Sequence, residues 1–380
     1  MIRIKSDKII LKDKTVSGYV YLENGTIAAV TDEDMPFEGE YDFSGYYVSP
    51  GFIDMHTHGG GGFSFDGSAD DVAAAANFHL THGTTSVYPT VSAAPIEVMA
   101  AAADSIKQAM DRRLAKANIM GIHMEGPYLS AKQCGAQCPD FIKNPDKSEY
   151  MPVMEKYGDY IARWSYAPEN DINHDFCRYI TDRGMIASAG HTDAVYDDML
   201  GAVQYGCNLV THLYSCTSTI TRDHGFRRLG VIETAFLLDD IYVEIFADGK
   251  HLPPELIRLI LKVKGTDRVA LITDSLSLAG TASKSGIMQA TEYVIEDGVC
   301  KLMDRSAFAG SIATADRLVR VVTGEAGVSL AEAVKMITYV PAQIMKLNKG
   351  ELSRGKDADI VVFDDDINIH NVFVMGNKII

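Results

Sequence analysis

The sequence predicts a protein of the α/β class: a TIM-type (β/α)8 barrel with a small β-sandwich domain built from both chain termini. In the middle of the chain, eight short apolar runs alternate with turns and helix-like segments, which is typical of parallel βα units. A count of eight favours a closed barrel over an open sheet. Strand-rich segments at both ends of the chain predict the small domain.

The two chain ends share a pattern of short strands. Residues 1–48 contain several apolar runs, and two of these runs are joined by Asn24 and Gly25, a pair that is typical of a hairpin turn. Runs of the same kind return after Gly350. The expected division of the chain is therefore a small β-sandwich domain from residues 1–49 and 345–380, and a catalytic barrel from residues 50–344.

Each element of the barrel is assigned from its local pattern. The predicted strands are short apolar runs followed by a turn, and they cover residues 47–58, 84–90, 119–125, 162–168, 185–191, 208–213, 241–248 and 269–274. The predicted helices have helical spacing or helix-forming residues, and they cover residues 68–79, 95–117, 193–205, 254–264, 314–323 and 329–339. Ser329 and Glu332 have capping-box spacing at the start of the last helix.

The composition limits the classes of partner. The 380 residues include 35 Lys and Arg against 51 Asp and Glu, and this net charge of -16 disfavours non-specific binding of nucleic acid or of an anionic membrane. No apolar run reaches the ~18 residues of a membrane span, and the first residues lack the apolar core of a signal peptide. The six cysteines are scattered, so we expect a reduced, cytoplasmic protein. We interpret the nearest pair, Cys134 and Cys138, as ordinary thiols rather than a zinc site.

Titratable side chains gather where the predicted strands end. These residues are His56, His58, Glu125, His191, His212, His251 and Asp274. Active sites of such barrels form at the carboxyl ends of the strands, so we expect these side chains to converge. One such histidine would usually be a core or capping residue. Several from different strands are costly to bury without a partner, and a metal ion is a common partner.

The residue types suit a metal centre. His56 and His58 stand two apart in a strand and therefore face the same side, and four glycines follow them. Glu125 offers an anionic oxygen, while His191 and His212 add nitrogen ligands. We expect a divalent transition metal, with zinc preferred over iron, at one or two ions per chain. Asp274 is the expected general base and acid; the alternative is a helix N-cap.

The other histidines are interpreted more simply. His79, His82, His174 and His370 are expected to be surface or packing residues, because none stands at the end of a predicted strand. His123 is expected to support a ligand or to lie in the core.

At these residues the sequence resembles the amidohydrolase superfamily and, within it, the N-acetylglucosamine-6-phosphate deacetylase family. The matching motifs occur in family order at residues 50–59, 123–129, 189–192, 211–214, 247–251, 273–274 and 355–361. The resemblance implies metal ligands at Glu125, His191 and His212, a catalytic carboxylate at Asp274 and a substrate contact at His251. Some members of the family lack the first histidine pair and hold one metal, so its presence here implies a second ion bridged by Glu125. The predicted fourth strand has no lysine of the kind that neighbouring subfamilies carbamylate.

Three departures from the family pattern fall on the expected substrate contacts. Gln137 stands where the family usually has histidine, the pair Ser215-Cys216 replaces Asn-Ala, and the loop 221–228 is longer and rich in arginine. By position, Arg227 is the best match for an arginine that meets a substrate phosphate in the family. The expected substrate-binding residues are Ala136, Gln137, Ser215, Cys216, Arg227, His251, Ala309 and Gly310.

The expected activity is metal-dependent removal of the N-acetyl group from a phosphorylated amino sugar. N-acetylglucosamine 6-phosphate is the leading substrate, and glucosamine 6-phosphate and acetate are the products. The alternatives are deacylation of another N-acyl amino sugar or of an N-acyl amino acid, and a barrel without activity, against which the complete residue set argues. We expect a homodimer that acts on a small molecule, with no nucleic-acid or membrane partner.

Overall fold

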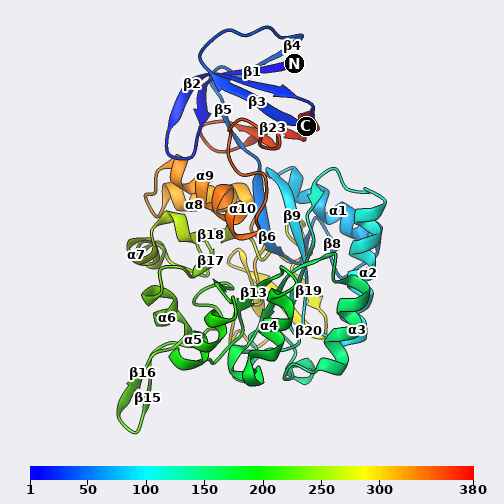
Figure 1. Ribbon diagram of the computed structural model, residues 1–380, viewed down its shortest axis with the longest axis vertical. Helices are drawn as coiled ribbons and strands as arrows, with labels where there is room; N and C mark the ends of the chain where they lie inside the picture. The colour runs from blue at the N-terminus through cyan, green and yellow to red at the C-terminus, as the bar shows by residue number, and fades with distance from the viewer.

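The computed structural model describes residues 1–380 and consists of a barrel with a smaller β layer at one end (Figure 1). Both chain termini lie in the small layer. No helix combines the length and the apolar character that crossing a bilayer requires.

Eight parallel strands form the barrel. In chain order they are β6 (Phe52–Thr57), β9 (Thr84–Val91), β11 (Ile122–Glu125), β12 (Ile161–Tyr166), β13 (Ile186–Ala189), β14 (Leu209–Val210), β17 (Tyr242–Phe246) and β18 (Val269–Ile272). The short strand β10 (Asn118–Ile119) also pairs with β9. Two backbone hydrogen bonds join the first strand to the last: Asp274 donates to the His56 carbonyl at 2.8 Å, and His58 donates to the Ser275 carbonyl at 2.9 Å. The predicted (β/α)8 barrel is confirmed.

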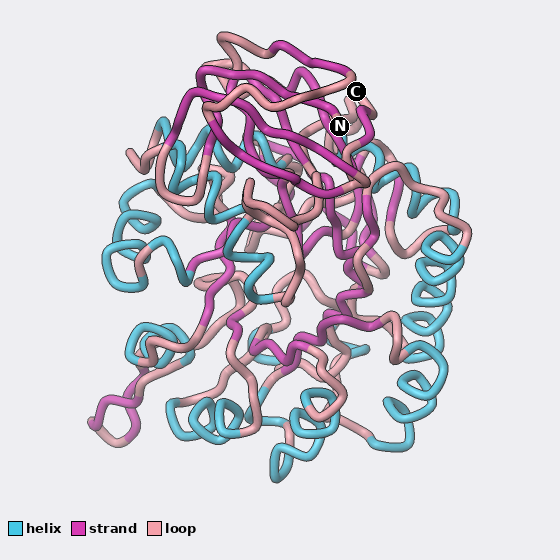
Figure 2. Tube along the Cα trace, turned by 45° about the horizontal axis from the view of Figure 1, so that its top comes forward, coloured by secondary structure: helices cyan, strands magenta, loops and turns pink.

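Helices surround the barrel strands (Figure 2). They are α1 (Ala69–Leu80), α2 (Ile96–Asp111), α3 (Lys147–Tyr157), α4 (Asp175–Thr181), α5 (Tyr196–Gln204), α6 (Val231–Leu237), α7 (Pro254–Lys264), α8 (Ala315–Gly324), α9 (Leu330–Ile337) and α10 (Tyr339–Ile344). Ser329 caps α9 as its spacing predicts, since its side chain accepts from the Glu332 backbone. Helix α2 ends earlier than expected because Arg113 adopts a left-handed conformation that turns the chain.

The apolar core lies in two places. Most buried apolar side chains fill the space between the barrel strands and the surrounding helices. A smaller cluster closes the barrel at the amino ends of its strands, where Ile53, Met55 and Tyr88 pack with Val340 and Ile344 of α10. The carboxyl ends of the strands are left for polar side chains.

The small β layer is one continuous sheet. Its strand order is β24 (Asn377–Lys378), β23 (Ile369–Val374), β22 (Ile360–Phe363), β5 (Tyr47–Pro50), β1 (Ile2–Ile10), β2 (Thr15–Glu23) and β3 (Thr26–Thr31), with β4 (Gly39–Asp42) beside β1. Asn24 and Gly25 form the predicted hairpin turn, and both have positive φ. The first predicted strand divides: residues 47–50 join this sheet, while residues 52–57 enter the barrel.

Three small sheets lie at the end of the barrel opposite the small β layer. They are β7 (Gly59–Gly60) with β8 (Phe63–Ser64), β15 (Thr221–Asp223) with β16 (Phe226–Arg228), and β19 (Ser285–Met288) with β20 (Thr291–Glu296) and β21 (Val299–Leu302). The sheet of β19 to β21 was not predicted. The hairpin of β15 and β16 pairs with no other strand and projects from the body of the molecule (Figure 1).

Candidate metal centre and active site

The predicted metal ligands meet at the carboxyl ends of the barrel strands. Glu125 is the last residue of β11, while His191, His212 and Asp274 each follow a barrel strand within two residues. These last three residues have positive φ values of 46°, 29° and 44°. Left-handed backbone costs a residue with a side chain about 1–3 kcal/mol and is concentrated at functional sites. The chain therefore turns sharply where each side chain enters the site.

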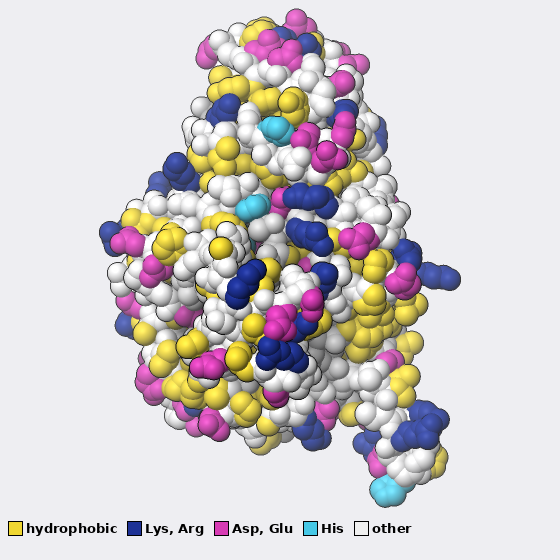
Figure 3. Space-filling view, turned by 180° about the vertical axis from the view of Figure 1, so that it is seen from behind, with side chains coloured by type: hydrophobic (Ala, Val, Ile, Leu, Met, Phe, Trp, Pro, Cys, Tyr) yellow, Lys and Arg dark blue, Asp and Glu magenta, His cyan; other side chains and the backbone are white.

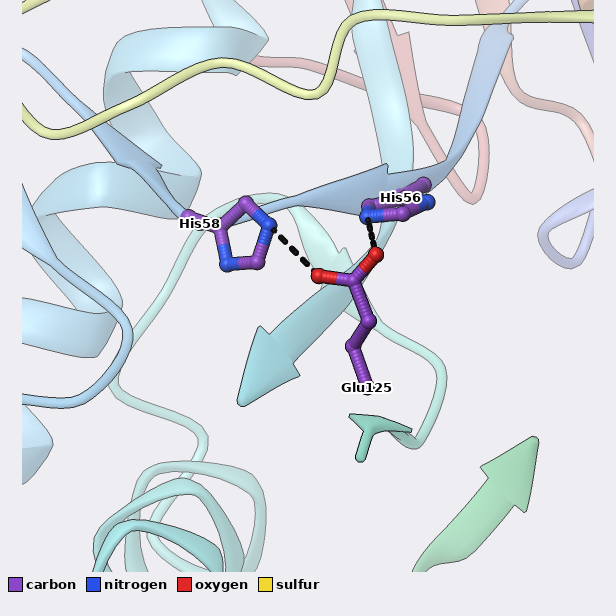
Figure 4. A group of neighbouring side chains, drawn as sticks. All are labelled: His56, His58 and Glu125. Atoms are coloured by element: carbon purple, nitrogen blue, oxygen red, sulfur yellow. Dashed lines mark ion pairs between the residues drawn. The ribbon is translucent and has the colours of Figure 1, made fainter. Parts of the chain in front are cut away.

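One group of possible ligands joins β6 to β11 (Figure 4). His56 Nε2 lies 3.3 Å from Glu125 Oε1, and His58 Nε2 lies 3.3 Å from Glu125 Oε2. All three side chains are buried. We call His56, His58 and Glu125 the first ligand group.

A second ligand group consists of Glu125, His191 and His212. Glu125 Oε1 lies 3.2 Å from His191 Nε2 and 3.0 Å from His212 Nε2, and the two Nε2 atoms are 3.1 Å apart. Two imidazole nitrogens and a carboxylate oxygen this close together are the ligand types and the spacing that suit one divalent cation. Because Glu125 belongs to both groups, its carboxylate could bridge two ions.

Hydrogen bonds from Nδ1 hold three of the four histidines. His58 Nδ1 contacts Ser92 Oγ, His191 Nδ1 contacts the Gln133 carbonyl, and His212 Nδ1 contacts the Ser215 carbonyl, each at 2.9 Å. The two carbonyls can only accept, so they place the proton of His191 and His212 on Nδ1 and leave Nε2 free as a ligand atom. The Ser92 hydroxyl holds the ring of His58 in place with Nε2 toward Glu125.

The electrostatics of the site favour positive charge. Burial alone would lower the pKa of the His56 imidazole, but the carboxylates of Glu125 and Asp274 outweigh it and raise the pKa to about 9. Burial would raise the pKa of Asp274, but His56 and His58 hold it at about 2. The same balance keeps the pKa of Glu125 well below its ordinary value. A cation placed between these carboxylates would meet the same attraction.

Asp274 lies beside the first ligand group and faces the cavity. Its Oδ1 is 3.0 Å from His58 Nε2 and 3.4 Å from His56 Nε2, and it forms no hydrogen bond. A carboxylate with a free oxygen next to the ligand atoms can exchange a proton with a water or a substrate there.

A cavity of about 260 Å³ opens over the metal centre. The residues that line it are His58, Glu125, Ala136, Gln137, His191, His212, Tyr214, Ser215, Cys216, Phe246, His251, Asp274, Leu276, Met288, Ala307, Phe308, Ala309 and Gly310. The structure thus brings every predicted site residue to this cavity except His56, which lies beneath it, and Arg227. No Lys or Arg lines the cavity.

Arg227 does not line the cavity of its own chain, so the predicted phosphate contact is not formed within a single chain. It lies in β16, on the exposed hairpin, where basic side chains gather at the tip (Figure 3). Its guanidinium contacts only the nearby Gly225 carbonyl at 3.2 Å. The physical reason is that β15 and β16 pair only with each other, so the hairpin extends into solvent. Its neighbour Arg228 pairs with Asp223.

Gln137 and His251 are held in place by specific contacts. Gln137 donates from Nε2 to Glu125 Oε2 at 2.9 Å and accepts from the Ala93 backbone at 3.0 Å. His251 Nδ1 lies 2.8 Å from Asp248 Oδ2, and its ring packs against Phe246 and Phe308. His251 therefore presents its free Nε2 in a fixed orientation.

Sequence reasoning missed several parts of the site. Met288, Ala307 and Phe308 line the cavity from the region of β19 to β21, which carries no recognisable motif. Outside the site, His79 is a packing residue, one of the two expected alternatives: it is fully buried and contacts the Gly59 carbonyl at 2.9 Å. His123 belongs to neither ligand group and lies between Thr90 Oγ1 and Ser165 Oγ. The Asp248–His251 contact had a signal, since the two residues stand three apart after a strand.

Fold and site together define a class of protein. A (β/α)8 barrel that gathers histidines around a shared carboxylate, with a free carboxylate beside them, is typical of metal-dependent hydrolases. A family model described as "Amidohydrolase family" matches residues 47–379, and the chain belongs to this family.

Curated relatives match almost the whole chain. The N-acetylglucosamine-6-phosphate deacetylase of Lysinibacillus sphaericus is 31% identical over 366 residues, which cover 94% of this chain and 92% of the relative. The N-acetylgalactosamine-6-phosphate deacetylase of Shewanella sp. (strain ANA-3) is 31% identical over 355 residues, which cover 92% of this chain and 87% of the relative. Among solved structures, the N-acetyl-D-glucosamine-6-phosphate deacetylase D267A mutant of Mycobacterium smegmatis, in complex with N-acetyl-D-glucosamine-6-phosphate, superposes with a TM-score of 0.92 at 27% identity. That match covers 99% of this chain and 98% of the other.

Proposed function

We propose that the protein removes the acetyl group from a phosphorylated N-acetyl amino sugar, with N-acetylglucosamine 6-phosphate as the leading substrate. The observation that carries this proposal is the complete site: two ligand groups share Glu125, and Asp274 stands beside them on the wall of a small cavity. The names of relatives that match nearly the whole chain supply the substrate class.

The donor set fits a divalent transition metal. Imidazole nitrogens and a carboxylate suit zinc, and iron is the alternative. His56, His58 and Glu125 would hold one ion, and Glu125, His191 and His212 another. A bound ion would supply a Lewis acid for the amide carbonyl and lower the pKa of water.

Asp274 is the proposed general base and acid. It takes the proton from the attacking water and then donates a proton to the amide nitrogen, which is a poor leaving group until it is protonated. The free Oδ1 of Asp274 fits this role because no other side chain occupies it by a hydrogen bond. The alternative role of a helix N-cap has no support, since no helix begins at the next residues.

The cavity walls are proposed to orient the sugar. His251 offers Nε2 from a ring that Asp248 and two aromatic rings hold in place. Ala136, Gln137, Ser215, Cys216, Ala309 and Gly310 complete the proposed substrate contacts.

The phosphate role of Arg227 requires more than one chain. The cavity lining holds no Lys or Arg, and Arg227 projects away on its hairpin. Arg227 can therefore meet a substrate phosphate only in a second copy, in the homodimer proposed for the cytoplasm. Arginine would suit that role because its planar donors can bind two phosphate oxygens at once.

A second candidate substrate is N-acetylgalactosamine 6-phosphate. The Shewanella relative that bears this name is as similar to the chain, at 31% identity, as the Lysinibacillus relative. Ser215 and Cys216, which depart from the family pattern, lie on the cavity wall, where they would contact the sugar.

Acetate release from a panel of substrates tests the proposal. The panel contains N-acetylglucosamine 6-phosphate, N-acetylgalactosamine 6-phosphate, unphosphorylated N-acetylglucosamine and an N-acetyl amino acid. We expect the highest kcat/KM for a phosphorylated sugar, with the glucosamine compound first. Equal or higher kcat/KM for the amino acid would contradict the proposal.

A further inference from the structure

A buried ion pair lies inside the barrel, directly beneath the first ligand group. Arg163 of β12 and Glu244 of β17 are both fully buried, and their side chains pair with each other. Their strands are not neighbours, because β13 and β14 lie between them, so the pair crosses the barrel interior. Barrel interiors are usually filled by branched apolar side chains, and a buried ion pair is weak evidence of stabilisation. The pair therefore calls for another explanation.

The guanidinium of Arg163 fixes the carboxylate of Glu244. Both terminal nitrogens of Arg163 donate to Glu244, and NH2 reaches Oε2 at 2.8 Å. The other donors are also used: Nε donates to Ser188 Oγ, NH2 to Thr211 Oγ1 and NH1 to the Met55 carbonyl. With all of its donors engaged, Arg163 leaves Glu244 one orientation.

Glu244 in turn faces His56. Glu244 Oε2 lies 3.5 Å from His56 Nδ1, while His56 Nε2 points to Glu125 on the other side of the ring. His56 is the one histidine of the two ligand groups whose Nδ1 forms no hydrogen bond. An Nδ1 proton on this buried ring has Glu244 as its facing acceptor.

We propose that Glu244, clamped by Arg163, is a positioning residue that presents His56 Nε2 to a metal ion and so sets the affinity of the first ligand group. This inference rests on the proposed metal centre. Glu244 faces Nδ1 of His56 and so favours the orientation of the ring in which Nε2 is directed at Glu125 and available as the ligand atom. A carboxylate partner also makes an imidazole a better donor than a carbonyl or hydroxyl partner does. Glu244 lines no part of the cavity.

The experiment measures metal binding alone, without substrate. Metal-free protein is titrated with Zn²⁺ against a coloured chelator, which gives the number of ions and their dissociation constants. Wild-type protein is expected to bind two ions. Glu244→Gln, which keeps the shape of the side chain, is expected to keep one ion and to bind the other about 10- to 100-fold more weakly. His56→Ala should lose the same ion.

A matched control separates positioning from folding. Asp359 is another buried carboxylate in an ion pair, with Lys349 Nζ at 2.7 Å, and it contacts Ser86 near the amino end of β9, away from the ligands. Asp359→Asn removes a buried charge of the same kind and is expected to bind both ions with wild-type affinity. If Glu244→Gln fails to fold, the double variant Arg163→Met/Glu244→Gln removes both charges together and should show the same loss.

Three results would overturn the proposal. The first is that Glu244→Gln, or the double variant, binds two ions with wild-type affinity. The second is that Glu244→Gln weakens the binding of both ions equally. The third is that wild-type protein binds a single ion and that His56→Ala leaves its binding unchanged. Because no substrate is present, an absence of deacetylation in the substrate panel would leave this measurement interpretable.

Discussion

At the scale of single residues, the two carboxylates at the barrel mouth have different surroundings and therefore different proposed tasks. Glu125 is surrounded by four imidazole rings and a glutamine amide, and both of its oxygens are engaged. Asp274 contacts only His56 and His58 and keeps an oxygen without a hydrogen bond. Glu125 is thus suited to hold ions, and Asp274 to carry a proton.

We predict that Asp274→Asn retains metal but loses activity. The amide has nearly the same shape but cannot take a proton, so kcat should fall on the order of 10²–10⁴, the usual contribution of a general acid or base. Elemental analysis of the variant and steady-state kinetics on the best substrate of the panel test this. Near-normal turnover in a metal-loaded variant would remove Asp274 from the proposed mechanism.

His79 is predicted to make stability depend on pH. Burial lowers its pKa to about 4, against 6.5 for an ordinary histidine. Between these values the unfolded chain binds a proton that the folded protein does not, so stability falls as the pH falls from 6.5 towards 4. Between pH 7 and pH 5, this one group should lower the free energy of unfolding by about 2 kcal/mol.

Urea unfolding of metal-free protein at pH 7 and pH 5 measures this effect of His79. His79→Gln, which can still donate to the Gly59 carbonyl, should lose less stability between the two pH values than wild-type protein does. His370→Gln, at an exposed histidine, is the control and should behave as wild-type. An unchanged pH dependence in His79→Gln would show that His79 is not responsible.

At the scale of elements, the strand ends set the distances between ligands. Gly190 follows β13 and precedes His191, and Thr211 follows β14 and precedes His212. A Cβ atom on Gly190 would lie 2.7 Å from Thr211 Cβ, which is too close for two such atoms. The two strand ends can approach each other, and bring their histidines to one point, because residue 190 has no side chain.

We predict that Gly190→Ala pushes these two strand ends apart. The overpacking should destabilise the protein by about 1–3 kcal/mol and weaken the ion held by the second ligand group. Gly324→Ala in α8 is the control, because a Cβ there meets no atom within 4 Å. Thermal unfolding and zinc titration compare the two variants, and equal behaviour of both would contradict the steric argument.

The projecting hairpin gives the second prediction at this scale. If Arg227 serves a partner chain, Arg227→Ala should raise KM for a phosphorylated sugar more than it lowers kcat, and should leave the unphosphorylated sugar unaffected. Arg228→Ala is the matched control, since Arg228 already pairs with Asp223 in the same hairpin. An equal loss of kcat/KM on both sugars would mean that the hairpin does not bind the substrate's phosphate.

The sequence predicted most elements and the meeting of the candidate metal ligands at one end of the barrel, but not what depends on contacts between distant segments. The helix predicted over 254–264 has these bounds in the structure, because Pro254 and Gly265 mark its ends. The pairing of Arg163 with Glu244 was not visible, since nothing local shows that both side chains turn inward. The projection of Arg227 away from its own cavity was not predictable, because sequence order places its hairpin after a ligand strand but says nothing of its direction.

At the scale of the whole molecule, the packing that closes the barrel and the proposed active site lie at opposite ends of the barrel strands. The small sheet and α10 close the amino ends of the strands, while the ligand groups and the cavity occupy the carboxyl ends. No residue of the small sheet lines the cavity. The two chain ends therefore support the barrel, and the proposed chemistry depends on the loops at its other end.

The proposed deacetylation of an amino-sugar phosphate depends on metal bound at the site centred on Glu125. The most direct test measures acetate release from N-acetylglucosamine 6-phosphate by protein stripped of metal with a chelator and then reloaded with Zn²⁺ or Fe²⁺. We expect activity to disappear when the metal is removed and to return as one or two ions per chain bind. Full activity in the stripped protein, or no acetate from fully loaded protein, would contradict it.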